Sequence, residues 1–301
     1  MITYFKRTVR GRKMAASDMF SVGSWISAIN PSDEEINYLA ERFGLNEQNL
    51  RSGLDKNEIP RVEFEEEATY IIVKVISKGE LLPDTILIAI SGDFILTLSG
   101  RRPSFVKRIF DRNIKIITTQ RRNTLIKFLL MINEDFEKET FETIRIVNAK
   151  KGEMKEIGEK ELKTLLQQEE KLNALVNSYN YARVVYDKLL KKIEFFEEDQ
   201  EIMEDLIIES EQGLDLCKSS LRTISNIRNY QTVLLSTKTN RTITILTIVT
   251  IFFSVSTAIF GFYGMNVALP FEEAPFVYAY IAFFSILAGL LISAYFLRSS
   301  R

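Results

Sequence analysis

The stretch Tyr263-Gly264-Met265-Asn266 lies near the boundary between two long apolar runs at the C-terminal end of the chain. No charged residue occurs from Thr242 to Phe271, and none occurs from Ala274 to Leu297. A helix needs about 20 mostly apolar residues to cross the hydrocarbon core of a bilayer, so each run is long enough to span a membrane. We therefore expect two membrane-spanning helices joined by a short turn, with Gly-Met-Asn where the first span ends.

The rest of the chain has the composition of a water-soluble protein. Of its 301 residues 26% are charged, and the formal net charge of −1 gives no overall field that would attract nucleic acid. The single cysteine, Cys217, excludes an internal disulfide and fits a reducing compartment. The absence of histidine excludes histidine-based catalysis and histidine metal ligands. No nucleophile–base pair or carboxylate cluster stands out, so an enzyme is the least favoured class.

The charges that flank the two spans predict their orientation. Lysine and arginine residues of short flanking segments stay on the cytoplasmic side of a membrane. They stand before the first span and after the second, at Lys238, Arg241, Arg298 and Arg301. The turn between the spans carries only Glu272 and Glu273. We expect an external loop at 263–274, a second span with a cytoplasmic tail at 275–301, and both termini on the cytoplasmic side of the cell (inner or plasma) membrane.

Residues 1–120 are expected to form a mixed α/β domain. Trp25-Ile26-Ser27 has the composition of a short strand. A helix should begin after Ser32, because this serine can cap it and Glu35, three residues later, completes a capping box. Apolar residues then recur at helical spacing until Gly44, which is expected to end the helix.

The second half of this domain is predicted to be a sheet. The β-branched and aromatic run Thr69–Val75 is typical of a strand. Thr85–Ile90 and Phe94–Leu98 follow, joined by Ser91-Gly92-Asp93, which has the composition of a hairpin turn.

Long helices are predicted for the middle of the chain. Residues 121–193 should form two antiparallel helices with a joint between Gly152 and Gly158. The pattern at 194–262 contains no proline, so the stalk and the first span should be one helix of about 100 Å at ~1.5 Å per residue. Gly213 is a candidate bend in it.

A stripe of small and hydroxyl residues runs along the first span. Its members recur every three or four positions: Asn240, Ile243, Thr247, Thr250, Ser254, Thr257 and Gly261. Such a stripe can serve close packing between helices, or it can line a water-filled pore. We favour a pore, because a plain two-helix anchor needs no stripe of this length. One two-helix chain cannot enclose a channel, so several copies would surround a common axis.

A Gly-Met-Asn at the end of the first of two C-terminal spans, after a large charged domain, resembles the CorA-type magnesium channel family. Gly261 and Tyr263 fit the glycine-x-tyrosine sequence that precedes this tripeptide in the family. The order of Trp25, capped helix, Phe-Gly, Pro-Arg-x-Glu at 60–63, strand and hairpin is similar to its cytoplasmic domain. The resemblance implies an α/β cytoplasmic domain, a long stalk helix that continues into a two-helix transmembrane hairpin, and a membrane homo-oligomer, namely a homopentamer.

The chemistry near the tripeptide suits a hydrated cation. Mg²⁺ gives up its water reluctantly, and neutral carbonyl groups can accept hydrogen bonds from coordinated water without removing it. Asn266 offers a side-chain amide and Gly264 a backbone carbonyl, with unrestricted φ to leave the helix. Met265 belongs to the same selectivity motif as a packing residue, since a thioether suits a hard cation poorly. Glu272 and Glu273 either raise the local cation concentration or form a solvated polar turn.

The chain departs from the family pattern in two places. The usual Met-Pro pair of the first span is Ser254-Val255 here, which leaves Ile243 or Leu246 as the expected apolar gate. Family members close on intracellular Mg²⁺ bound by acidic side chains, and Asp205 matches one such position.

The partner position of that regulatory site, eight residues after Phe43-Gly44, is Ser52 in this chain, beside Arg51. Asp55 is the nearest acid. We therefore expect regulation by Mg²⁺ to be weaker or rearranged.

The sequence thus favours passive Mg²⁺ uptake, with Co²⁺ or Ni²⁺ as further substrates. A transporter of Zn²⁺ or another divalent cation on the same scaffold, and a membrane-anchored sensor or scaffold without transport, remain alternatives. The expected partners are further copies of the chain, the lipid bilayer and divalent cations, with no nucleic acid. Mg²⁺ is expected as the transported ion and as a regulatory ion.

Overall fold

The computed structural model describes residues 1–11, 14–111, 114–152, 158–266 and 275–299. The chain divides into two compact units, Met1–Ile227 and Arg228–Arg301, which are described in turn. One helix, α6 (Glu197–Tyr263), has its first part in the first unit and the remainder in the second.

The described part of the first unit holds a seven-stranded sheet with the order β2-β1-β3-β7-β6-β5-β4. Neighbouring strands are antiparallel except β3 and β7, which are parallel. The strands are β1 Ile2–Lys6, β2 Ala15–Ser17, β3 Ser24–Ile29, β4 Arg61–Phe64, β5 Ala68–Val75, β6 Asp84–Ser91 and β7 Phe94–Ser99. The predicted hairpin is therefore the β6–β7 pair. The sequence pattern did not predict β1 and β2.

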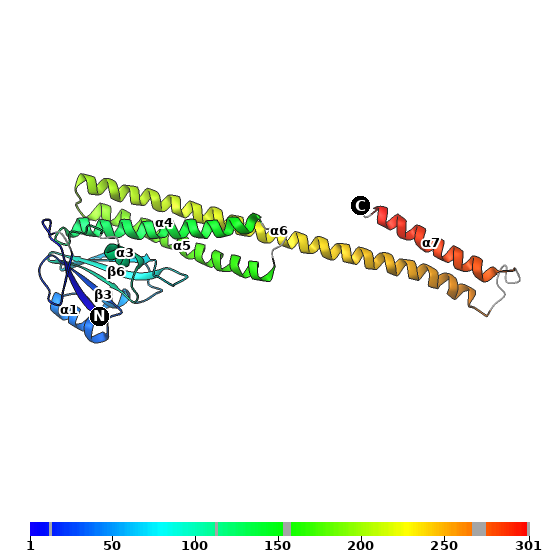
Figure 1. Ribbon diagram of the computed structural model, residues 1–301, viewed down its shortest axis with the longest axis horizontal. Coiled ribbons are helices and arrows are strands. Elements are labelled where there is room, and N and C mark those ends of the chain that lie inside the picture. The colour runs from blue at the N-terminus through cyan, green and yellow to red at the C-terminus, as the bar shows by residue number, and fades with distance from the viewer. Residues whose placement is uncertain (12–13, 112–113, 153–157, 267–274, 300–301) are drawn as a thin grey trace. The chain divides into compact units, whose positions relative to one another are not determined.

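Both faces of the sheet are covered by helices (Figure 1). Side chains alternate along a strand, so Ile71 and Val73 of β5 enter one buried cluster while Tyr70 and Ile72 enter the other. This double burial explains why the central strands are apolar without interruption. One cluster includes α1 (Asp33–Phe43) and α2 (Glu47–Ser52). The other includes α3 (Ser104–Asp111), α4 (Arg121–Gly152), α5 (Glu159–Lys192) and the first part of α6.

The predicted start and end of α1 are confirmed. The Glu35 backbone N–H donates to Ser32 Oγ at 3.2 Å, and the Ser32 N–H donates to Glu35 Oε2 at 3.0 Å. Glu35 also accepts a hydrogen bond of 2.8 Å from the ammonium group of Met1, which ties α1 to the first strand. Gly44 ends the helix with a φ of 66°, a conformation that favours glycine.

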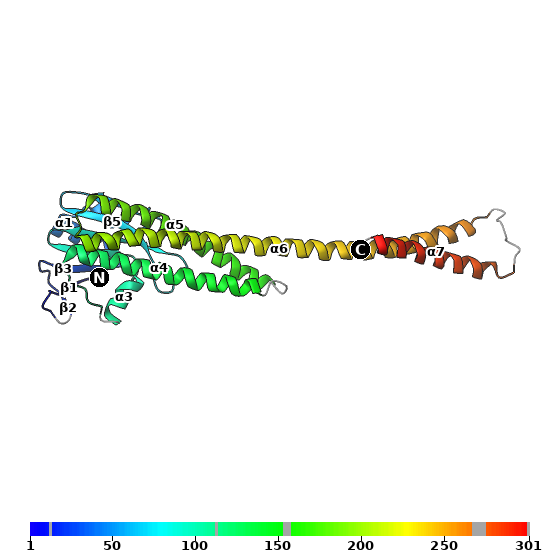
Figure 2. The ribbon, with the colours of Figure 1, turned by 90° about the horizontal axis from the view of Figure 1, so that it is seen from above.

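The helices α4, α5 and the first part of α6 lie side by side (Figures 1 and 2). Gly213, the candidate bend, is buried against Tyr179 of α5, and a Cβ added to it would lie 2.4 Å from the Tyr179 Cζ. Tyr179 is fixed in turn by a 3.1 Å hydrogen bond between its hydroxyl group and Thr140 Oγ1. The structure therefore gives Gly213 a packing function: it lets α6 approach the tyrosine ring.

Substitution of this glycine tests the packing. Gly213→Ala should lower the midpoint of thermal unfolding of the full chain, followed by circular dichroism. Overpacking costs about 1–3 kcal/mol, whereas alanine gains only ~1 kcal/mol over glycine in a helix. Gly100→Ala is the matched control, because a Cβ at Gly100 meets no atom within 4 Å. A higher midpoint for Gly213→Ala would show that helix propensity dominates and that the close approach to Tyr179 is relieved at little cost.

Candidate functional site

Among the described residues, two helices are long and apolar enough to cross a membrane: part of α6, and Tyr278–Phe296 within α7 (Val277–Ser299). In the most apolar 18-residue segment of α6, no residue is buried inside the chain, and in that of α7 only 17% are. A core helix of a soluble protein would be mostly buried. These apolar surfaces therefore need lipid or other copies of the chain to cover them.

Within the second unit, one face of α6 packs on α7. A Cβ added to Gly289 of α7 would lie 2.8 Å from Phe252 Cδ2, so small size at Gly289 permits this contact. The half-buried positions of α6 recur at helical spacing through Phe252. Between residues 244 and 259 they are Thr244, Ile248, Ile251, Phe252, Val255, Ser256 and Ile259.

The predicted stripe lies on the opposite side of α6. At 100° per residue, it is centred about 130° around the helix from the α7-facing positions. All seven of its members, from Asn240 to Gly261, are exposed within the chain. The hairpin therefore leaves the stripe uncovered, whether the stripe lines a pore or packs against another copy.

The threonine hydroxyl groups of this stripe present hydrogen-bond acceptors on the surface of α6 that α7 does not cover. Thr247 Oγ1 donates to the Ile243 carbonyl at 2.8 Å, and Thr250 Oγ1 donates to the Leu246 carbonyl at 2.9 Å. Each hydroxyl has one hydrogen, so these bonds leave only oxygen lone pairs for an outside partner. Such acceptors suit the water molecules around a cation, whose hydrogens point outward.

The tripeptide lies at the end of α6, where all three of its residues are exposed. The Gly264 N–H donates to the Phe260 carbonyl at 2.9 Å, so Gly264 still closes the last turn. Gly264 was expected to leave the helix with an unrestricted φ, but it does not use the left-handed region. Its small size matters instead, because a Cβ would lie 3.3 Å from the Phe260 carbonyl oxygen. Met265 and Asn266 follow, while Glu272 and Glu273 lie outside the described residues.

The two candidate regulatory acids lie in the first unit. Asp205 is exposed on α6, and Asp55 is exposed in the loop after α2, where its Oδ1 accepts the Asn57 N–H at 2.8 Å. Within the described ranges of the single chain, no group of three or more Asp, Glu, His or Cys residues is placed to hold a metal ion.

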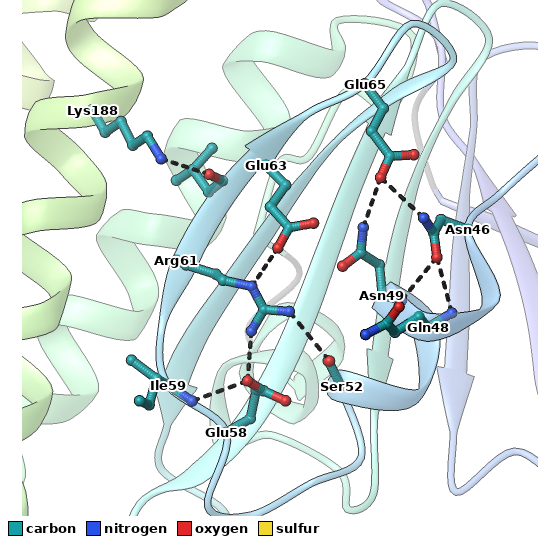
Figure 3. Close-up of polar contacts among 11 residues, drawn as sticks. Asn46, Gln48, Asn49, Ser52, Glu58, Ile59, Arg61, Glu63, Glu65 and Lys188 are labelled. Carbon is teal, nitrogen blue, oxygen red and sulfur yellow. Dashed lines mark hydrogen bonds and ion pairs between the residues drawn. The ribbon is translucent and has the colours of Figure 1, made fainter.

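The carboxylates near Ser52 are already paired with an arginine, Arg61 (Figure 3). Arg61 pairs with Glu58 and Glu63, each at 2.5 Å, and its Nη2 donates to Ser52 Oγ at 3.3 Å. The hydrogen bond from Arg61 lowers the pKa of Glu63, which keeps this carboxylate ionised.

A second arginine neutralises the neighbouring acids. Arg51 pairs with Asp33 at 2.6 Å and with Glu47 at 2.8 Å. The region where a partner for Asp205 was expected is therefore held together by guanidinium groups, and Asp55 stands outside both clusters. Sequence reasoning missed these pairs, although the Pro-Arg-x-Glu segment and Arg51 were both noted.

The two candidate spans and the uncovered stripe are features of a membrane protein. The family model described as CorA-like Mg²⁺ transporter protein matches residues 21–298. The chain belongs to this family. It is a CorA-family divalent cation transporter and not an enzyme, as the sequence predicted.

Individual proteins support this assignment. The chain is 29% identical over 271 residues to the cobalt/magnesium transport protein CorA of Methanocaldococcus jannaschii, which covers 83% of this chain and 82% of that protein. The complete structure of the CorA magnesium transporter from the same organism has a TM-score of 0.87 at 23% identity, covering 100% of this chain and 98% of that one. The full-length CmaX structure has a TM-score of 0.71 at 16% identity, covering 99% and 96%. The predicted fold class is thereby confirmed.

Cysteine labelling tests which face of α6 meets water. In liposomes, Thr250→Cys should react with a charged, membrane-impermeant maleimide at least about tenfold faster than Ile248→Cys, which lies at the same depth on the α7 side. The native Cys217 should stay silent, because it is buried and burial raises its pKa to about 11. Equal rates at the two positions, or no labelling at either, would contradict an aqueous stripe.

Proposed function

We propose that the chain carries Mg²⁺ passively into the cell as a homopentamer, with Co²⁺ and Ni²⁺ as further substrates. The observation that supports this most is the uncovered stripe, whose threonine hydroxyls at Thr247 and Thr250 present only acceptor lone pairs. Copies of the chain arranged around one axis would turn these acceptors toward a common water-filled path. The cobalt/magnesium transport protein of Methanocaldococcus jannaschii, the relative described above, supports the choice of ions.

Selection would take place at the Gly-Met-Asn tripeptide. A ring of Asn266 amides and Gly264 carbonyls would accept hydrogen bonds from the water bound to Mg²⁺, so the ion keeps its hydration shell. Met265 would hold the ring by packing. Glu272 and Glu273 of the external loop would raise the local concentration of cations.

The membrane potential supplies the driving force. With both termini cytoplasmic, as the flanking Lys238 and Arg298 suggest, the tripeptide faces the outside. A dication that moves through 100 mV toward a negative interior is stabilised by roughly 4.6 kcal/mol. At equilibrium this corresponds to an internal concentration of the ion more than about a thousandfold above the external one.

The narrowest apolar level of the path would be formed by Ile243 or Leu246, which are exposed on α6 at 56% and 66%.

Uptake by reconstituted protein tests the proposed selectivity ring. Asn266→Ala should lower the initial rate of Mg²⁺ uptake into liposomes at least about tenfold, because each copy loses a hydrogen bond to a charged, hydrated ion. Asn148→Ala, on an exposed position of α4, is the matched control and should transport at the wild-type rate. A wild-type rate for Asn266→Ala would remove the tripeptide from the ion path.

The same assay separates the alternatives. Faster uptake of Zn²⁺ than of Mg²⁺ by the wild type would favour a zinc transporter on this scaffold. No uptake of any divalent cation would favour a membrane-anchored sensor or scaffold.

We propose Asp205 and Asp55 as acids that bind intracellular Mg²⁺ between neighbouring copies. The arginine pairs around Ser52 favour Asp55 as the partner, since Arg51 and Arg61 already neutralise the acids nearest to Ser52. A site with few carboxylates should bind Mg²⁺ weakly.

Current measurements at varied internal Mg²⁺ test this regulation. Asp205→Ala should raise the internal Mg²⁺ concentration that halves the current by about threefold, the change expected for one exposed charge. Asp215→Ala removes another exposed acid of α6 and should leave the curve unchanged. An unchanged curve for Asp205→Ala would show that this carboxylate does not bind the regulatory ion.

A further inference from the structure

A cavity in the first unit has no part in the proposed transport path. It measures about 870 Å³, within the range of small-molecule sites. It lies where the first turn of α4, the turn between α5 and α6, and one end of the sheet meet, at one end of the first unit (Figure 1). Its lining combines aromatic, basic and acidic side chains.

The basic part of the lining is free to take an anion. Arg121 at the start of α4 is half-buried, and Lys192 at the end of α5 is exposed, and neither forms an ion pair within the part of the chain that the structure describes. The first turn of α4, a helix of 32 residues, carries no acidic residue, so its N–H groups add positive potential on the same side. Arg122 is used differently, because its Nη1 donates to the Glu194 carbonyl at 2.7 Å and fixes the α5–α6 turn.

The acidic part of the lining is one buried carboxylate with exposed neighbours. Asp199 of α6 is only 8% exposed, and its Oδ1 accepts a long hydrogen bond of 3.5 Å from Asn123 Nδ2. Glu194 and Glu198 are exposed at the rim. These acids would repel a bare anion. They do not form an all-protein metal site among the described residues either.

A magnesium complex of a phosphate ester satisfies both kinds of charge. Proteins usually hold Mg²⁺ with one or two carboxylates plus the phosphates of a bound ligand, while the ion keeps several waters. Asp199 can receive hydrated Mg²⁺, while Arg121, Lys192 and the α4 N-terminus receive phosphate oxygens.

The aromatic part of the lining favours a ligand with a flat ring. Phe64 at the end of β4 is 41% exposed and Phe196 before α6 is 78% exposed. Stacking on an aromatic face accepts any nucleobase, because every base has a π-face. We propose that this cavity binds the Mg²⁺ complex of a nucleoside polyphosphate, with phosphates at Arg121 and Lys192, the hydrated ion at Asp199 and the base against the phenylalanines.

Binding of MgATP to the purified full chain tests this site, with calorimetry as the readout. We expect wild-type binding to weaken at least about tenfold in Arg121→Glu and in Lys192→Glu, because each loses a charged partner of phosphate. Lys163→Glu, an exposed lysine on the same helix as Lys192, makes the same charge change away from the cavity and should bind as wild type does.

Three further binding measurements test the chemical class of the ligand. ATP with EDTA should bind at least about tenfold more weakly than MgATP to the wild type, and Asp199→Asn should remove most of that difference. Inorganic phosphate with MgCl₂ should not compete. Failure of the wild type to bind MgATP, unchanged binding in both basic-site variants, equal binding with EDTA, or full competition by phosphate would each overturn the proposal.

Two measurements keep these results interpretable. Circular dichroism shows whether each variant is folded, and the exposed Lys192 gives a variant with little risk of misfolding. Mg²⁺ uptake in nucleotide-free liposomes measures transport separately. Loss of the transport proposal would therefore leave the nucleotide site standing, and the reverse also holds.

Discussion

One constraint governs the membrane part of the chain: a hairpin of two apolar helices cannot cover its own polar stripe. Packing of Phe252 against Gly289 uses one side of α6, and this leaves Thr247 and Thr250 uncovered on the other side. Each of these hydroxyls already donates to a carbonyl of its own helix, and its remaining lone pairs can accept hydrogen bonds from water or protein but not from lipid tails. Further copies of the same chain provide the simplest cover. Self-association would cover this exposed surface, and the proposed ion path would run along the same face of α6.

The α/β domain, unlike the membrane hairpin, covers the apolar surfaces of its own sheet. Its sheet is covered on both faces, so residues such as Ile71 and Ile72, adjacent on β5, enter different buried clusters. Helix α6 belongs to this packing in its first part, where Gly213 brings it against Tyr179. A hydrogen bond between Tyr179 and Thr140 joins α5 to α4 within the helical layer. The first part of α6 is therefore fixed within the packed core of the first unit.

Charge pairing within the first unit separates two kinds of acidic residues. The acids near Ser52 form ion pairs with Arg51 and Arg61, so their carboxylates hold the loop and the edge strand and are not free to bind a metal ion. Asp199 and Asp205 are not paired in this way within the described residues. Acidic side chains thus form structural ion pairs near Ser52, whereas Asp199 and Asp205 have no arginine partner in the part of the chain that the structure describes. The positions of the arginines distinguish these two groups of acids.

Sequence patterns alone predict the two spans, the capping box at Ser32, the β6–β7 hairpin and the family, because each depends on neighbouring residues or on a fixed spacing along one element. They also locate the stripe, since helical periodicity places its members on one face. Three-dimensional packing was needed to show that this face lies away from α7, that Gly264 is needed for its small size, and that Gly213 faces a tyrosine ring. The same holds for β1, for the arginine pairs and for the cavity beside Asp199. The contacts of Gly213 with Tyr179, of β1 with β3 and of Arg51 with Asp33 join residues far apart in the chain, and no local pattern shows which of them will meet. The contacts of Gly264 and Arg61 are local, but they depend on backbone and side-chain conformations that the sequence pattern does not give.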